Sequence, residues 1–224
     1  LSIETDALWG KVVTIDHGFG IKSRYCGIEP GDIEKGQKVE VSEVIGTLGD
    51  IPCELLDGPH LHLEITVNGA YTDPVEAIGR GIALTRQLAA EGYGLVATGE
   101  MGIGNTTTSS AVAAVLLAQP VQTMTGRGAG LSDAGLARKV DAIRRGIACN
   151  NPNSTDALDV LSKLGGFDIA GLCGMFLGGA LAGVPVLMDG FISGVAALCA
   201  VRLCPAAAKA VFASHCSIEP AARL

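Results

Sequence analysis

The sequence predicts an α/β protein in which a small all-β domain precedes a layered domain with a mostly parallel sheet. Within residues 9–67, short apolar runs are separated by glycine-rich turns, which is typical of β-strands. From Gly81 onward, the apolar spacing changes to a helical period, and helices then alternate with short apolar strands. We therefore predict an incomplete all-β domain at residues 1–79 and an α/β domain at residues 80–224.

The all-β domain is expected to contain strands at residues 11–15, 39–48 and 61–67. Asn68-Gly69 is a typical hairpin turn, because both residues tolerate a positive φ angle. A strand ending at residue 67 and a return strand from Tyr71 would flank it. Pro30-Gly31-Asp32 is a second predicted turn.

The α/β domain is expected to begin with a helix from Gly81. Ser132 and Thr155 are candidate N-caps for two later helices, since their hydroxyls can accept hydrogen bonds from the first backbone N–H groups. The remaining expected helices lie at residues 105–118, 132–148, 155–164, 169–182 and 193–203, and the strands lie at residues 94–98, 184–188 and 210–214.

The composition excludes some classes of function. Residues 1–80 carry 14 acidic and 6 basic side chains, whereas residues 81–224 carry 9 and 10, and neither part gathers its basic side chains into a stripe. We therefore expect no nucleic-acid partner. The seven cysteines are odd in number and show no CxxC spacing, which favours buried, reduced thiols in a reducing compartment.

Residues 169–188 contain no charged side chain over twenty positions, which is long enough to span a bilayer. The same stretch contains five glycines and Pro185, which weaken a continuous helix. We expect a buried helix followed by a buried strand, and no membrane association. A membrane span is the alternative, and it predicts partition into detergent.

A glycine-rich loop carries the densest candidate chemistry, at residues 98–110. Gly102 and Gly104 let several backbone N–H groups point at one spot, where a strand ends and a helix begins. Such a site suits a monophosphate. The alternative is a simple strand-to-helix turn with Asn105 or Thr106 as its N-cap. Glu100 favours a ligand-binding site over a simple turn. A carboxylate beside a phosphate is electrostatically unfavourable, so we expect Glu100 to bind sugar hydroxyls or a developing cation.

A second glycine loop occupies residues 125–130 and precedes a basic helix. Lys139 or Arg127 could complete an anion site there. Arg144 and Arg145 on the same helix are expected to form a solvated face. Asp189 follows an expected strand and is either a further site residue or a turn residue.

Six segments of the second domain occur in a consistent order and identify a family. Together they resemble nicotinate-nucleotide:dimethylbenzimidazole phosphoribosyltransferases. The segments are GEMGIGNTTTSSAV, TGRGAG, ARKVDAIRRGI, DALDVLSKLGGFDIAGLCG, VPVLMDGFIS and SHCSIEP. The resemblance implies transfer of phosphoribose from nicotinate mononucleotide to 5,6-dimethylbenzimidazole, giving α-ribazole 5'-phosphate, in a cytoplasmic homodimer without cofactor or metal.

The resemblance also implies roles for individual residues. Glu100 would lie against the ribose as the catalytic carboxylate. The substrate-binding residues would be Gly102, Gly104, Asn105, Thr106, Thr107, Gly128 and Lys139. The family's general-base glutamate lies in a Gly-Glu-Gly segment near its carboxyl terminus, and the sequence ends at Leu224 before such a segment. The family's N-terminal region, which helps to form the benzimidazole pocket, is likewise not in the sequence.

The first domain carries a different signature. His60 and His62 lie on one face of an expected strand, because strand side chains alternate, and such a pair can share a metal. With the segments GKVVTIDHGFGIKSRY, KGQKVEVSEVIGTLGD and VNGAYTDP, the motif resembles lysostaphin-type zinc endopeptidases. The resemblance implies a zinc ligand at His62 and a catalytic histidine at His60. The sequence does not contain the segment that supplies the other two ligands, and Gly27 stands where the family has a third histidine. We therefore expect a degenerate site without metal.

The two resemblances imply two compartments, since the endopeptidases act outside the membrane. We expect that the sequence joins two incomplete genes near residues 78–81 and that its start at Leu1 lies inside a longer reading frame. The alternative function is a non-catalytic cell-envelope scaffold with a degenerate endopeptidase fold.

Overall fold

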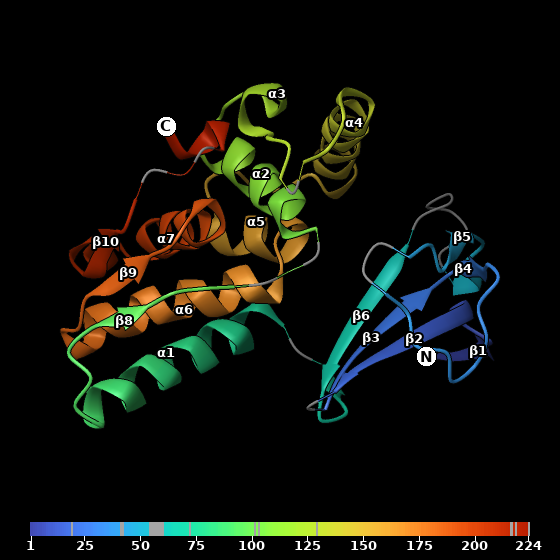
Figure 1. Cartoon of the computed structure of the whole chain (residues 1–224), viewed down its shortest axis with the longest axis horizontal. Coiled ribbons are helices and arrows are strands. Elements are labelled where there is room, and N and C mark those ends of the chain that lie inside the picture. Colours follow the sequence, from blue (N-terminus) through green and yellow to red (C-terminus); the bar gives the residue numbers. More distant parts are fainter. Residues whose placement is uncertain are drawn as a thin grey trace. The chain divides into compact units, whose positions relative to one another are not determined.

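The computed structural model describes the whole chain except residues 19, 41–42, 54–60, 72, 101, 103, 129, 216, 218 and 224. The chain folds into two compact units, Leu1–Thr72 and Asp73–Leu224 (Figure 1).

The first unit is built on a five-stranded antiparallel sheet with the order β1-β2-β3-β6-β7 (Figure 1). Its strands are β1 (Ser2–Asp6), β2 (Gly10–Gly18), β3 (Ile21–Cys26), β6 (His62–Val67) and β7 (Ala70–Tyr71). A two-stranded sheet adds β4 (Ile28–Pro30) and β5 (Gly46–Leu48). The core gathers around Val13, Ile28 and Ile33. The predicted all-β fold of this region is confirmed.

The register of β3 and β6 separates two faces of the larger sheet. Cys26 pairs with His62, and Arg24 pairs with Glu64, so these four side chains share one face. Tyr25, which lies between Arg24 and Cys26, packs against the apolar core on the other face. One face of this sheet is therefore charged and the other is apolar.

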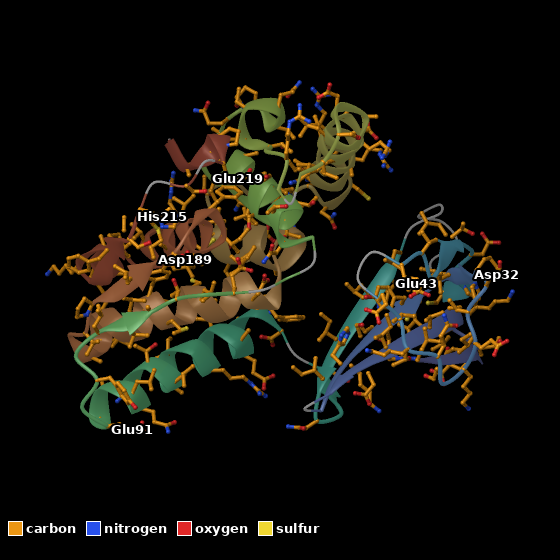
Figure 2. The ribbon with its side chains drawn as sticks, viewed as in Figure 1. Asp32, Glu43, Glu91, Asp189, His215 and Glu219 are labelled. Carbon is orange, nitrogen blue, oxygen red and sulfur yellow. The ribbon has the colours of Figure 1, made fainter. Side chains whose placement is uncertain are left out.

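The strand expected at residues 39–48 is much shorter in the structure, where only β5 is a strand among the described residues of this stretch. Glu43 explains part of the difference, since its carboxylate accepts a hydrogen bond from the Glu40 backbone N–H at 2.8 Å and another from Gln37 Nε2 at 3.0 Å (Figure 2). These local bonds engage groups of this stretch outside any strand ladder. The Asn68-Gly69 hairpin turn is confirmed, with φ angles of 53° and 81°.

The second unit surrounds a three-stranded parallel sheet with the order β10-β9-β8 (Figure 1). The strands are β8 (Val96–Ala97), β9 (Val186–Met188) and β10 (Val211–Ala213). The helices are α1 (Pro74–Ala90), α2 (Asn105–Leu116), α3 (Val121–Met124), α4 (Asp133–Asn150), α5 (Ala157–Leu164), α6 (Phe167–Ala182) and α7 (Phe191–Leu203), with short 3-10 helices η2 (Pro205–Ala210) and η3 (Pro220–Arg223). The predicted alternation of helices and parallel strands is confirmed.

Helix α1 starts earlier than expected. The Asp73 side chain caps it by accepting a hydrogen bond from the Glu76 N–H at 2.7 Å, and Pro74 occupies its first turn. The helix therefore runs through the boundary expected at residues 79–80, and the compact units divide between residues 72 and 73. Among the other expected caps, Ser132 caps α4, whereas Asp156 rather than Thr155 caps α5.

Glycines allow α1 and α6 to pack closely. A Cβ on Gly81 would lie 2.0 Å from the Gly171 carbonyl oxygen, and a Cβ on Gly174 would lie 2.0 Å from the Ile78 carbonyl oxygen.

The apolar stretch at residues 169–188 forms most of a buried helix, then a turn at Gly183, then β9. Within the part of the chain that the structure describes, no helix is long and apolar enough to cross a membrane.

The described cysteines are all free thiols, and they divide evenly by burial. Cys26, Cys173 and Cys199 are buried as expected, whereas Cys53, Cys149 and Cys204 are exposed. The expectation of buried thiols therefore holds for only half of them.

Candidate functional site

The carboxyl ends of the three parallel strands are tied together by hydroxyl groups. Thr98 Oγ1, just after β8, donates to the Leu187 carbonyl oxygen at 2.9 Å and accepts from the Asp189 N–H at 3.3 Å. Ser214 Oγ, just after β10, donates to the Met188 carbonyl oxygen at 2.8 Å. This edge of a parallel sheet is where α/β proteins bind their ligands.

The first glycine loop leads from this edge into α2. Gly104 is the residue before the helix, with φ 81°, and it supplies no side-chain cap. Asn105 and Thr106 are therefore the first residues of the helix, and the alternative in which one of them acts as the N-cap is wrong. The N–H groups of the first turn give this end of α2 a partial positive charge that favours an anion.

The Asn105 side chain connects two carboxylates. Its Nδ2 donates to Glu100 Oε2 and, at 3.1 Å, to Asp168 Oδ2 on the first turn of α6. Burial raises the pKa of the Glu100 carboxyl, and the negative charges of Asp168 and Asp189 add to the increase, while the Asn105 hydrogen bond opposes it. Glu100 is thus held beside the loop with a carboxylate more basic than usual.

Lys139 on α4 reaches the same region from the other side. Its side chain is buried, with the residue only 7% exposed, and its ammonium group donates to Thr106 Oγ1 at 2.9 Å and to the Gly126 carbonyl oxygen at 3.0 Å. Burial lowers the pKa of Lys139, and the charge of Glu219 partly offsets this decrease. Lys139 therefore joins the first glycine loop to the second, and an anion placed there would compensate its buried charge.

The other basic residues near the second loop point elsewhere. Arg127 pairs with Asp133 and donates to the Leu131 carbonyl oxygen at 2.8 Å, so of the two cations considered from sequence, Lys139 is the one that contacts the first loop. Arg144 is exposed, and Arg145 is exposed and pairs with Asp141 on the same helix. Both therefore belong to a solvated face.

Gly128 brings the second loop against α2 and the carboxyl-terminal segment. Its φ angle is 54°, and a Cβ there would lie 2.9 Å from Thr106 Oγ1. Its N–H donates to Glu219 Oε1 at 3.0 Å. Figure 2 labels Glu219, His215 and Asp189, which lie on the segments that approach this edge of the sheet.

Sequence reasoning missed two residues that the structure brings into the site. Asp168 lies 63 positions after Asn105 in the chain, and Glu219 lies 91 positions after Gly128. The available signal for Asp168 was its place directly before the helix predicted at residues 169–182. For Glu219 it was the SHCSIEP segment after the last strand.

An apolar cavity of about 240 Å³ lies between α2, α7 and the carboxyl-terminal segment. Phe191, Val195 and Leu198 of α7 form one wall, and His215 contributes a polar ring. Met188 and Gly190, which flank Asp189 in the sequence, also line the cavity.

Among the residues that the structure describes, the candidate site of the first unit lacks a set of metal ligands. The His62 ring stacks on Trp9 with centroids 4.0 Å apart, and its Nε2 lies 3.8 Å from Glu64 Oε1. Burial, followed by the charge of Glu64, raises the pKa of the Cys26 thiol to about 11, so this neighbour is a protonated thiol. His60 lies outside the described residues. Within the described ranges, no three His, Cys, Asp or Glu side chains could hold a metal ion, and the side chains present do not fit zinc.

The fold and site of the second unit define an α/β domain that presents glycine loops, a buried lysine and a carboxylate cluster at the carboxyl edge of a parallel sheet. A phosphoribosyltransferase family model matches residues 71–224, and the chain belongs to this family. A second model, for peptidase family M23, matches residues 2–74.

Several known proteins are similar to this chain. The nicotinate-nucleotide–dimethylbenzimidazole phosphoribosyltransferase of Acetivibrio thermocellus is 51% identical over 151 residues, which is 67% of this chain and 43% of that protein. The protein of the same name from Desulforamulus reducens is 49% identical over 197 residues, or 85% of this chain and 56% of that protein. The crystal structure of CobT from Thermus thermophilus aligns with a TM-score of 0.63 and 37% identity, covering 70% of this chain and 49% of that chain. The chain thus spans about half the length of the relatives it matches.

Proposed function

We propose that the second unit binds nicotinate mononucleotide and takes part in the transfer of its phosphoribose to 5,6-dimethylbenzimidazole, which gives α-ribazole 5'-phosphate for the nucleotide loop of cobalamin. Family membership and the names of the relatives support this reaction. The observation that carries the proposal is the bridge that Lys139 makes between Thr106 and Gly126, because it places a buried cation where two glycine loops meet.

The phosphate group would bind at this junction. Lys139 supplies the positive charge, and the start of α2 supplies N–H groups and a favourable dipole. Gly104 and Gly128 both have positive φ angles and carry no side chain. A ligand could therefore approach the backbone closely at these two positions. The other proposed contacts come from Gly102, Asn105, Thr106 and Thr107.

Glu100 would act on the ribose. In the transfer, a ring nitrogen of the benzimidazole forms a bond to the anomeric carbon, and nicotinate leaves with the electron pair of the old bond. A carboxylate beside the ribose stabilises the positive charge that develops there. The proton that the second ring nitrogen loses goes to a general base, which in the family is the glutamate of the Gly-Glu-Gly segment. Neither a cofactor nor a metal enters this proposal.

We also propose that the protein acts in the cytoplasm as a homodimer, as the family resemblance implies. Sedimentation equilibrium of the full chain measures the oligomeric state, and a monomer at micromolar concentration would contradict the dimer.

Calorimetric titration of the full chain with nicotinate mononucleotide tests the binding step, and chromatography after addition of dimethylbenzimidazole tests the transfer. We expect saturable binding that weakens with added phosphate, because both anions would compete for Lys139. Folded protein that binds no mononucleotide would overturn the proposal. Binding without product would restrict this chain to the substrate-binding step.

A second candidate function concerns the first unit. Its match to peptidase family M23 and its charged sheet face support a scaffold that recognises peptidoglycan without cleaving it. Retention of the full chain on purified cell wall would favour this function, whereas the nucleotide-binding function predicts no retention.

A further inference from the structure

We infer that Asp168 is a positioning residue for Glu100 and that it acts through the side-chain amide of Asn105. This inference rests on the proposed function, in which Glu100 acts on the ribose. The three side chains come from different parts of the chain, namely the loop after β8, the start of α2 and the first turn of α6. Asn105 Nδ2 joins them, with Asp168 Oδ2 at 3.1 Å.

The orientation of the Asn105 amide follows from its partners. Ionised carboxylates only accept hydrogen bonds, so the amide must present its NH₂ group to Glu100 and to Asp168. The reverse orientation would place the amide oxygen against two acceptors. With both N–H groups engaged, the amide cannot rotate without losing a charge-assisted bond, and Glu100 is held through it.

Two glycines make room for this arrangement. A Cβ on Gly102 would lie 2.7 Å from Asn105 Nδ2 and 3.0 Å from Asp168 Oδ2. A Cβ on Gly166, the residue before α6, would lie 2.5 Å from Asp168 Oδ1. The Asp168 carboxylate therefore lies close to the first turn of α6, a 16-residue helix whose dipole stabilises the negative charge of this carboxylate.

Asp168 has a second effect on Glu100, which is electrostatic. The charged groups that act on the Glu100 carboxyl are Asp168 on α6 and Asp189 after β9, and both raise its pKa in addition to burial. Asp168 thus fixes the position of Glu100 through Asn105 and keeps its carboxylate basic through like charge. Two variants separate these effects. Asp168→Asn retains an oxygen that can accept from Asn105 but has no charge, whereas Asp168→Ala has neither.

Carboxyl NMR of the full chain tests the electrostatic effect without any ligand. We expect the pKa of Glu100 to fall in Asp168→Asn, because a nearby like charge is removed while an acceptor for Asn105 is kept. The matched control is Asp141→Asn, which alters an exposed carboxylate on α4 and should leave the pKa of Glu100 unchanged. A Glu100 pKa that does not move in Asp168→Asn would overturn the electrostatic part of the inference.

The side-chain amide signals of Asn105 test the positioning effect. In the native chain and in Asp168→Asn we expect the two N–H signals to lie away from the positions of a free, solvated side-chain amide. In Asp168→Ala they should move toward the free-amide positions, and affinity for nicotinate mononucleotide should fall more than in Asp168→Asn. Unchanged Asn105 signals in Asp168→Ala would overturn the positioning role. If the signals and the pKa respond as expected but no form binds the mononucleotide, the proposed function fails and the structural link between Asp168 and Glu100 stands.

Discussion

Two partly buried glutamates show how the two units differ. Glu64 in the first unit is 11% exposed at its side chain and pairs with Arg24, which is 19% exposed. Glu100 in the second unit is also partly buried, but the charges that act on it are the carboxylates of Asp168 and Asp189. A buried charge next to its opposite is compensated within the fold, whereas a buried charge among like charges is typical of a functional site.

The difference also indicates where each unit could do chemistry. The charged face of the first sheet is neutralised internally, and its histidine is stacked on an indole ring. The second unit keeps a carboxylate with a raised pKa, Glu100, in its first glycine loop, and a lysine with a lowered pKa, Lys139, whose ammonium group contacts both glycine loops. Among the described residues, the second unit therefore presents the groups whose charges a ligand could compensate.

The largest expected effect comes from breaking the ion pair of the first unit. Arg24→Met leaves Glu64 buried without this partner and should destabilise the unit by about 3 kcal/mol. Trp9, the single tryptophan of the chain, lies in this unit, so its fluorescence during urea unfolding reports on it alone. The double variant Arg24→Met, Glu64→Met should recover much of the loss. An equal loss in both would show that the pair is not the cause.

The next effect concerns the cation of the second unit. Lys139→Met should weaken binding of nicotinate mononucleotide by roughly 10- to 100-fold, since a charge-assisted hydrogen bond contributes about 1.5–3 kcal/mol. Calorimetry measures the dissociation constant. Arg145→Ala is the matched control on the same helix, because this side chain is 75% exposed and pairs locally with Asp141, and it should stay within about twofold of the native value. Equal losses in the two variants would refute a specific role for Lys139.

Neutralising Glu100 should stabilise the second unit at neutral pH. Because the folded pKa of Glu100 is raised, its stabilising effect is full below the unfolded pKa of about 4.5 and is lost as the pH rises through the folded pKa. Glu100→Gln should therefore raise the melting temperature at pH 7 by roughly 1–3 °C. Near pH 4 the difference should vanish, so calorimetric melting at the two pH values contains its own control. A lower melting temperature of Glu100→Gln at pH 7 would contradict an environment that disfavours the ionised form of Glu100.

The smallest effect compares two buried hydroxyls on α2. Ser109 Oγ is buried without a hydrogen-bond partner among the described residues, whereas Ser110 Oγ donates to the Thr106 carbonyl oxygen at 2.7 Å. Ser109→Ala should stabilise the second unit by about 0.5–1 kcal/mol, because it removes an unsatisfied polar group. Ser110→Ala should give no such gain. Urea unfolding followed by circular dichroism measures the stability of both variants. Equal changes in stability would show that the missing hydrogen-bond partner of Ser109 is not the cause.

Much of the fold could be predicted because its signals are local. The helices and strands of the second unit follow from apolar periodicity, and the Asn68-Gly69 turn follows from backbone preferences. The helix expected from Gly81 starts too late, because Asp73 caps α1 and Pro74 occupies its first turn. The strand expected at residues 39–48 is shorter in part because the Glu43 side chain bonds locally, and periodicity does not reveal such bonds.

The candidate site was predictable only where its residues are neighbours in sequence. The loop from Glu100 to Thr107 is a continuous motif, and Lys139 was one of two cations considered. Asp168 and Glu219 enter through tertiary folding, and a lone acidic residue at the start of a helix is usually only a favourable interaction with the dipole. The choice between Lys139 and Arg127 likewise needed the structure, which pairs Arg127 with Asp133.

Because Lys139 is buried, the chemical reactivity of its amine should report whether a ligand occupies the candidate site. Amine-reactive labels should modify Lys163 and Lys209 readily, since both are exposed, but should reach Lys139 only when the loops open. The ratio of labelling at Lys139 to labelling at the exposed lysines, measured by mass spectrometry, would then follow ligand binding in native protein without a dye, a tag or a mutation.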